Sequence, residues 1–225
     1  MRANMPRPHV TLKLATSLDG RIATASGESR WITSPESRAA VQQLRAAAQA
    51  VMVGAGTARA DDPELLARTE PPPLRQPLRV VLDTEFSLPP RGRLFSSLDR
   101  APLLVIGALD ADANARAGLE AAGARTAAVA RGPVGIDAEA ALDRLGAEGI
   151  AQVLVEGGGV LAASLIAADA VERLEWFRAP IILGGDGRPA VAALALGRLA
   201  EAPTWRRVAL RELGPDLWES YERAS

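Results

Sequence analysis

The chain has 225 residues, 48% hydrophobic and 24% charged, and its 26 Lys and Arg nearly balance its 27 Asp and Glu. The resulting net charge of −1 offers no electrostatic attraction for a nucleic-acid backbone, so nucleic-acid binding is not expected. The lack of Cys and the presence of one His, His9, exclude thiolate catalysis, disulfides and Cys/His zinc sites. No apolar run approaches the roughly 18 residues of a membrane span, and the first residues lack the apolar stretch of a signal peptide. The expected location is the cytoplasm.

Apolar runs alternate with Ala-rich amphipathic segments, which predicts an α/β architecture in a single domain over residues 1–225. In chain order, strands are expected at Val10–Ala15, Ala50–Val53, Leu78–Leu82, Leu103–Ile106, Thr126–Val129 and Gln152–Val155. Helices are expected at Pro35–Ala48, Ala111–Ala122 and Asp137–Gly146. Ser34 is the expected N-cap of the first helix, and Asp110 and Asp137 are expected to cap the next two.

The pattern changes after a fourth expected helix at Val160–Ala168. The remaining strands are expected at Val171–Phe177, Trp205–Leu210 and Asp216–Glu222, and no helix separates the last two. Strands joined without a crossover pair antiparallel. The sequence therefore predicts a mixed, mostly parallel sheet flanked by helices, with an antiparallel edge at the C-terminal end.

Two glycine-rich segments directly follow apolar strands, at Glu156–Ser164 and Gly54–Pro63. Consecutive glycines let the backbone approach a ligand closely, and the unpaired N–H groups that open the next helix attract phosphate. Ligands of α/β proteins bind at the carboxyl ends of parallel strands. These segments are therefore candidates for holding a dinucleotide pyrophosphate, although each pattern also fits an ordinary tight connection.

Several single residues add to this pattern. Lys13 lies inside an apolar strand and needs a partner or a ligand there, because an isolated buried ammonium is costly. Asp19 precedes a glycine and is interpreted as a turn residue, and Trp31 taken alone is interpreted as a core aromatic. Arg45 and Arg68 suit bidentate phosphate binding, although either one alone is also typical of a solvated surface.

With these segments in view, the sequence resembles the reductase domain of riboflavin biosynthesis, the C-terminal half of RibD-type deaminase–reductases. The resemblance is carried by Lys13-Leu-Ala-Thr-Ser-Leu-Asp-Gly-Arg, Gly27-Glu-Ser-Arg-Trp-Ile-Thr, Leu44-Arg-Ala, Gly56-Thr-Ala-Arg-Ala-Asp-Asp-Pro, Gln76-Pro-Leu-Arg-Val-Val-Leu-Asp, Val155-Glu-Gly-Gly-Gly-Val-Leu-Ala and Ala179-Pro-Ile-Ile-Leu-Gly-Gly. It implies a dihydrofolate-reductase-like fold, a homodimer and the NADPH-dependent reduction of 5-amino-6-(5-phosphoribosylamino)uracil to its ribityl product.

The resemblance also implies residue roles at the positions that match these motifs. The cofactor would be held by Ala15, Trp31, Thr57, Asp61 and Thr84, and by a pyrophosphate turn of Gly158, Gly159, Val160, Leu161, Ala162, Ala163 and Ser164. The phosphorylated substrate would be held by Ser29, Arg45, Leu65, Arg68 and Glu156. Lys13 and Glu156 are the expected catalytic residues, with Lys13 or water supplying the proton that opens the ribose ring.

One departure from the bifunctional pattern is informative. The deaminase half of such proteins uses a zinc site that contains Cys, and this sequence has none, so a stand-alone reductase is expected. Its substrate is then either the aminouracil or the undeaminated diaminopyrimidinone. A reductase for another small molecule and a non-catalytic nucleotide-binding partner of a separate deaminase are the alternatives.

Overall fold

The structure, a computed structural model, describes residues 7–224. These residues form two compact units, and each is described by itself. The first unit combines residues 7–9 with Gln43–Val155, and the second combines Val10–Gln42 with residues 156–224.

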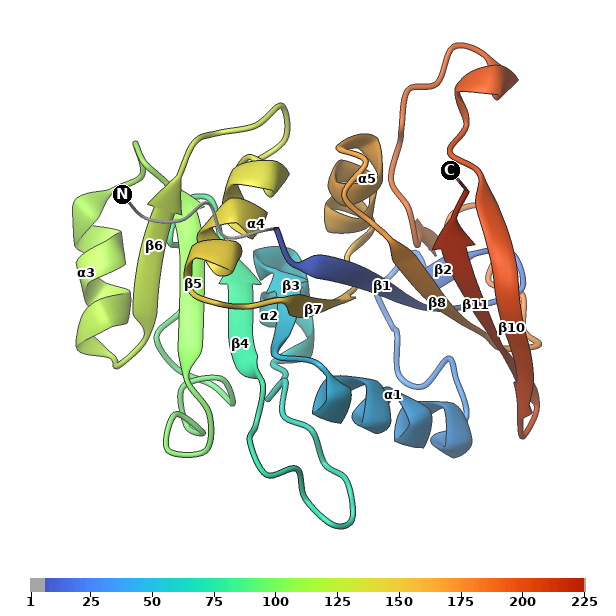
Figure 1. Cartoon of the computed structure of the whole chain (residues 1–225), viewed down its shortest axis with the longest axis horizontal. Coiled ribbons are helices and arrows are strands. Elements are labelled where there is room, and N and C mark those ends of the chain that lie inside the picture. Colours follow the sequence, from blue (N-terminus) through green and yellow to red (C-terminus); the bar gives the residue numbers. More distant parts are fainter. Residues whose placement is uncertain (1–6, 225) are drawn as a thin grey trace. The chain divides into compact units, whose positions relative to one another are not determined.

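The first unit is built on five parallel strands in the order β7-β3-β4-β5-β6, seen as a row in Figure 1. Their bounds are Ala50–Gly54 for β3, Leu78–Leu82 for β4, Leu103–Ala108 for β5, Arg125–Val129 for β6 and Gln152–Glu156 for β7. The central strands are apolar at almost every position, as expected of strands buried on both faces. All five lie where the sequence predicts them, within two residues at each end.

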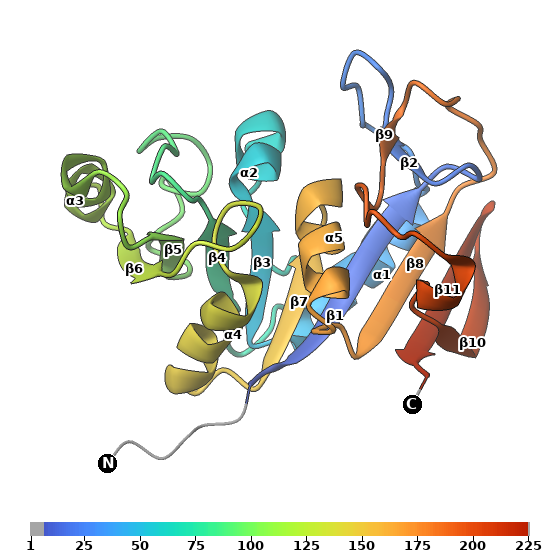
Figure 2. The ribbon, with the colours of Figure 1, turned by 90° about the horizontal axis from the view of Figure 1, so that it is seen from above.

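Three helices flank this sheet: α2 (Ala55–Asp61), α3 (Ala113–Ala121) and α4 (Ala138–Ala147). Figure 2 shows α2 and α3 on one face and α4 on the other. The α2 and α3 side buries one alternate set of strand residues together with helix and loop side chains, namely Val51, Val53, Val81, Leu103, Val105, Leu154, Ala55, Ala58, Leu119, Leu65, Phe86, Leu88 and Leu94. Because strand side chains alternate between the two faces of a sheet, the remaining strand residues point toward the face that α4 covers.

The helix caps correct one expectation. Asp137 caps α4 as predicted, accepting from the amides of Glu139 and Ala140. The N-cap of α3 is Asp112 and not Asp110, because α3 begins two residues later than predicted. Asp110 instead forms an ion pair with Arg131 at 2.7 Å.

A buried guanidinium ties the loops of the first unit to β4. Arg79 is fully buried, and its donors reach the carbonyls of Leu94, Ser97 and Ala101 and the Ser97 hydroxyl. It also donates to the Glu64 carbonyl at 3.3 Å. Burial lowers the pKa of Arg79 to about 10, so it remains charged at neutral pH. One side chain therefore anchors two separate loop segments.

Replacing Arg79 with Met is expected to lower the free energy of unfolding by about 2–4 kcal/mol. Each carbonyl left unpaired in the interior costs about 1–3 kcal/mol, and part of this is offset because no charge is buried any longer. Urea unfolding measures the change. The matched control is Arg100→Met, which removes a half-exposed ion pair with Glu64 and is expected to cost less than about 1 kcal/mol. Equal stability of the two variants would contradict the anchoring role.

The second unit contains the antiparallel edge that the sequence predicts. Its strands β10, β11, β8 and β1 lie in that order; β1 pairs parallel with β8, and β11 pairs antiparallel with both of its neighbours. Their bounds are His9–Thr16 for β1, Arg173–Arg178 for β8, Trp205–Leu213 for β10 and Asp216–Arg223 for β11. A short separate ribbon of β2 (Arg21–Ala23) and β9 (Arg188–Pro189) was not predicted.

The helices of this unit are α5 (Gly159–Ala167), the one-turn η1 (Leu199–Glu201) and the first part of α1 (Pro35–Ala47). Ser34 caps α1 as predicted, because its hydroxyl accepts from the amide of Ser37 at 3.2 Å. Among the described residues, no helix is both long and apolar enough to cross a membrane.

Candidate functional site

In the first unit, the expected cofactor residues lie where β3 and β4 end. The chain leaves β3 through Gly54 into α2, which carries the half-buried Thr57 and Asp61 one turn apart. Thr84 follows β4, and its hydroxyl lies close to Gly135, where an added Cβ would come within 2.9 Å of Thr84 Oγ1. The parallel arrangement thus places Thr57 and Thr84 beyond the carboxyl ends of adjacent strands.

The segment between α2 and β4, residues 62–68, carries two expected substrate residues and is held by side chains from outside it. Gln76 donates to the Ala67 carbonyl at 2.9 Å and accepts from the Ala67 amide at 2.8 Å. Arg45, on α1, donates to the Leu66 carbonyl at 3.0 Å. Because of these bonds, Arg45 lies against the same segment that carries Arg68.

The two expected substrate residues of this segment differ in the exposure of their side chains. Arg68 is half exposed, and one of its contacts is Glu64 at 3.5 Å. Leu65 is 1% exposed, with its side chain in the apolar core and a positive φ of 56°. A ligand contact of Leu65 would therefore be made by its main chain. The motif alone does not reveal this difference.

In the second unit, the glycine turn expected to hold a pyrophosphate leads into α5. Gly157 and Gly158 have φ of 72° and 90°, which side-chain-bearing residues rarely adopt, and no side chain caps the first turn of α5. Gly159 packs against the chain near β9, since an added Cβ would lie 2.5 Å from the Pro189 carbonyl oxygen. The turn therefore leaves main-chain N–H groups available for an anion.

The rest of the expected run is less uniform. Leu161, Ala162 and Ala163 are buried in the core of the second unit, and the Ser164 hydroxyl donates to the Val160 carbonyl of its own helix. The start of the run, which ends at the half-exposed Val160, is the part that a ligand can contact. The sequence located the turn correctly but does not separate its ligand-facing residues from its core residues.

Replacing Gly159 with Ala is expected to lower the free energy of unfolding by about 1–3 kcal/mol, because the new methyl group collides with the Pro189 carbonyl. Urea unfolding measures the loss. Gly56→Ala is the matched control: Gly56 is also at a helix start after a strand, but nothing lies within 4 Å of its added Cβ. That variant is expected to be as stable as the parent or more so. An unchanged free energy of unfolding in Gly159→Ala would show that the turn is not tightly packed.

The face of β1 that carries Lys13 also carries Ala15, and these half-buried residues alternate with the buried Leu12, Leu14 and Thr16 of the opposite face. The register of β1 with β8 pairs Lys13 with Glu175. Neighbours in register project to the same face, so a carboxylate lies beside the expected catalytic lysine.

Glu175 is the functional candidate that the sequence reasoning missed. It is 2% exposed and accepts from Trp218 Nε1 and the Ser220 hydroxyl, each at 2.6 Å, and from Arg173 at 2.5 Å. The available signal in the sequence was a Glu between the apolar Leu174 and Trp176 inside the predicted strand. Three donors explain how its charge is accommodated in the interior.

Asp19 is a turn residue, as interpreted from the sequence. Its carboxylate accepts from the Ser17 hydroxyl at 2.6 Å and from the amides of Leu183 and Gly184. These hydrogen bonds, the Ser17 bond above all, lower the pKa of Asp19 to about 2. The turn after β1 is thereby tied to the loop that follows β8.

Trp31 is not the core aromatic that its residue type suggests. Its side chain is 69% exposed, and it lies in the loop before α1 together with the half-buried Ser29. The guanidinium of Arg38 lies 4.5 Å from the centre of its ring. The exposed ring agrees with the ligand-binding role that the resemblance implies and not with the core interpretation.

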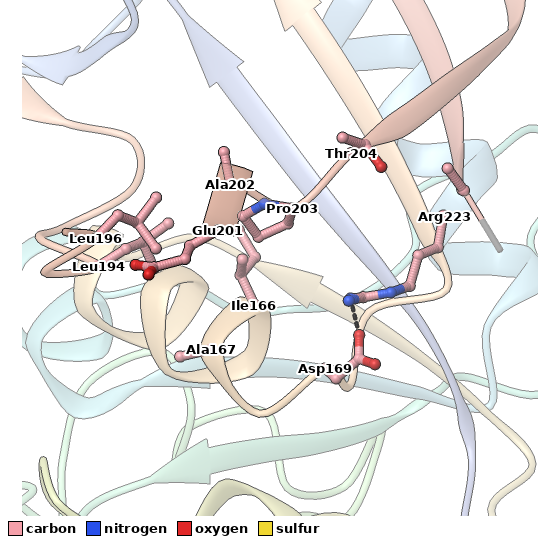
Figure 3. Close-up of a pocket in the computed structure, with 11 residues that line it drawn as sticks. Ile166, Ala167, Asp169, Leu194, Leu196, Glu201, Ala202, Pro203, Thr204 and Arg223 are labelled. Carbon is pink, nitrogen blue, oxygen red and sulfur yellow. Dashed lines mark ion pairs between the residues drawn. The ribbon is translucent and has the colours of Figure 1, made fainter. Parts of the chain in front are cut away.

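A cavity of about 490 Å³ lies in the second unit, at the far end of α5 from the glycine turn (Figure 3). It is lined by the end of α5, by the segment from Leu194 to Thr204 and by Arg223, which forms an ion pair with Asp169. None of the residues expected to bind cofactor or substrate lines it.

Comparisons with known proteins identify the family to which this chain belongs. Residues 8–218 match the family described as the RibD C-terminal domain. The riboflavin biosynthesis protein RibD of Bacillus amyloliquefaciens is 34% identical over 211 residues, which cover 93% of this chain and 56% of the relative.

Two solved structures extend the likeness to the fold. A Thermotoga maritima protein, named as a diaminohydroxyphosphoribosylaminopyrimidine deaminase/5-amino-6-(5-phosphoribosylamino)uracil reductase, is 27% identical with a TM-score of 0.78, over 97% of this chain and 57% of its own. Dihydrofolate reductase from Enterococcus faecalis, 14% identical over 96% of this chain and 97% of its own, has the same fold with a TM-score of 0.51. The fold is therefore of the dihydrofolate-reductase class. The chain belongs to the RibD C-terminal domain family, and it spans a little over half the length of the RibD relative.

Proposed function

We propose that this chain catalyses the NADPH-dependent reduction of 5-amino-6-(5-phosphoribosylamino)uracil, converting its ribosyl group into an open-chain ribityl group. The observation that carries the proposal is the family match over residues 8–218, which includes every residue expected to bind or react. The name of the Thermotoga maritima relative, which includes this reductase activity, supports the choice of substrate.

The residues at the glycine turn fit a dinucleotide cofactor. Positive φ at Gly157 and Gly158 and an uncapped start of α5 provide main-chain donors for a pyrophosphate, with no side chain in the way. Trp31, Thr57, Asp61, Thr84 and Ala15 would hold the remaining parts of the cofactor. When bound, NADPH supplies the hydride.

The substrate's phosphate is the expected partner of two arginines. Arg45 and Arg68 belong to one polar cluster around residues 62–68, and a planar guanidinium binds phosphate through two parallel hydrogen bonds. Ser29, Glu156 and the main chain of Leu65 would contact the remaining polar atoms of the substrate. Holding the sugar in one orientation supplies much of the rate enhancement in such a reaction.

Lys13 is the proposed proton donor. A proton delivered to the ring oxygen breaks the bond from this oxygen to C1′ and leaves a protonated imine between C1′ and the amino nitrogen, whose C1′ would receive the hydride. Lys13 occupies a half-buried strand position in register with the carboxylate of Glu175, which suits a side chain that delivers a proton from a defined place. Glu156 would orient the sugar by accepting hydrogen bonds.

The absorbance of NADPH at 340 nm tests the proposal directly. The purified chain is expected to oxidise NADPH in the presence of the aminouracil substrate and more slowly, or not at all, with the undeaminated diaminopyrimidinone. Faster oxidation with the second compound would place the enzyme before deamination. Cofactor binding without oxidation of either compound would favour another reductase substrate or a non-catalytic partner and would refute the assignment.

Lys13→Ala is expected to lower kcat by roughly 100-fold or more, because a positioned general acid contributes about that much. The affinity for NADPH should stay within twofold of the parent. Thr11→Ala is the matched control, since Thr11 lies on the same face of β1 two residues away. A Lys13→Ala enzyme with full activity would remove this residue from the mechanism and leave water as the proton source.

The homodimer, the cytoplasmic location, the single domain and the stand-alone organisation expected from the sequence stay predictions. Each is compatible with the reductase proposed above, and none is needed for it.

A further inference from the structure

The loop before α1 holds an exposed tryptophan in a defined position. Trp31 is 69% exposed, yet its ring lies against the Arg38 guanidinium, with 4.5 Å between the guanidinium carbon and the ring centre. The guanidinium carbon of Arg30 lies further from the centre of the Trp31 ring, at 5.8 Å. A cation over an indole face is an attractive contact that restricts the ring's orientation.

Arg38 is itself restrained from the opposite side. Its Nη1 donates to the Thr33 carbonyl at 2.6 Å, so the side chain folds back over the residues that precede α1. A planar guanidinium can make this hydrogen bond at its edge and stack with its face at the same time. Thr33, Arg38 and Trp31 therefore form one connected group.

The start of α1 is fixed by a buried carboxylate from another part of the second unit. Asp216, at the turn between β10 and β11, is 1% exposed and accepts from the Ser34 amide at 2.7 Å and the Ser37 hydroxyl at 2.6 Å. Ser34 also donates its hydroxyl to the Leu213 carbonyl. The C-terminal hairpin thus holds the helix turn from which Arg38 projects.

We propose that Arg38 is a positioning residue that presents Trp31 as a preformed ring face for a planar ring of the nicotinamide cofactor. A tryptophan held in place but left exposed is suited to stacking on a ligand, because its conformational freedom is already lost before binding. The inference rests on the proposed function, which assigns Trp31 to the cofactor, and adds the residue that orients it.

The test is the dissociation constant of NADPH for the full chain, measured by calorimetry, in Arg38→Met, Trp31→Phe and the double variant. Arg38→Met keeps an unbranched apolar stem and removes the charge and the hydrogen bond. It is expected to weaken NADPH binding roughly 3- to 10-fold, and to weaken it less than twofold when Trp31 is already Phe. Arg38→Lys is expected to recover part of the affinity, because it restores the cation.

Arg211→Met is the matched control. Arg211 lies over the Trp218 ring at 4.7 Å, in a second cation–aromatic pair of the same unit, and it has no assigned role in binding. Its removal is expected to leave NADPH binding unchanged. A second measurement without cofactor covers the case of a poorly folded variant. The fluorescence of Trp31 is taken as the difference between a chain with Trp31 and the same chain with Trp31→Phe. Its quenching by acrylamide should increase in Arg38→Met and Arg38→Lys.

Three outcomes overturn the inference. One is an unchanged NADPH affinity in Arg38→Met, and another is an equal loss with and without Trp31, which would make Arg38 a direct ligand or a purely structural residue. In both cases turnover by the parent enzyme keeps the proposed function intact. The third is a parent chain that does not bind NADPH at all, which refutes the proposed function together with this inference.

Discussion

Among the described residues of the first unit, Arg79 is the buried cation, and no carboxylate lies within ion-pair distance of it. Arg79 is taken out of water inside an apolar strand, and its charge is stabilised by main-chain carbonyls of Glu64, Leu94, Ser97 and Ala101. Carbonyls can do this because a guanidinium has five donors in one plane. The result is that two irregular segments, one of which carries the expected substrate residues, are bound to the centre of the sheet.

The second unit buries carboxylates, namely Glu175, Asp216 and Glu219. Glu175 and Asp216 accept from side chains and amides, most of which belong to other elements. Glu175 joins β8 to β11 beside Lys13, whereas Asp216 joins the C-terminal hairpin to α1. The expected proton donor Lys13 is thus in register with one buried acid, and the other fixes the start of the helix that follows Trp31.

The candidate site was predictable in outline, and its exceptions have identifiable physical causes. The strand ends beside Thr57 and the glycine turn follow from local patterns of parallel strands and glycine exits, whereas Thr84 follows from the resemblance alone. Leu65 is buried and Trp31 is exposed, in each case against what the residue type or its assigned role suggests. Such exposures depend on what packs nearby, which a motif does not record.

The sequence by itself determined the kind of fold, the strand and helix positions within a few residues, the antiparallel edge and the family. These follow from hydrophobic periodicity, capping residues and contiguous motifs, all of which are local along the chain. Only the tertiary structure decided which charges are buried and what compensates them, that Asp112 and not Asp110 caps α3, and that Arg38 stacks on Trp31. Apart from Arg173, two residues from Glu175, the partners of Arg79, Glu175 and Asp216 lie 15 to 182 residues away. Contacts over such separations arise from packing, and no local pattern encodes them.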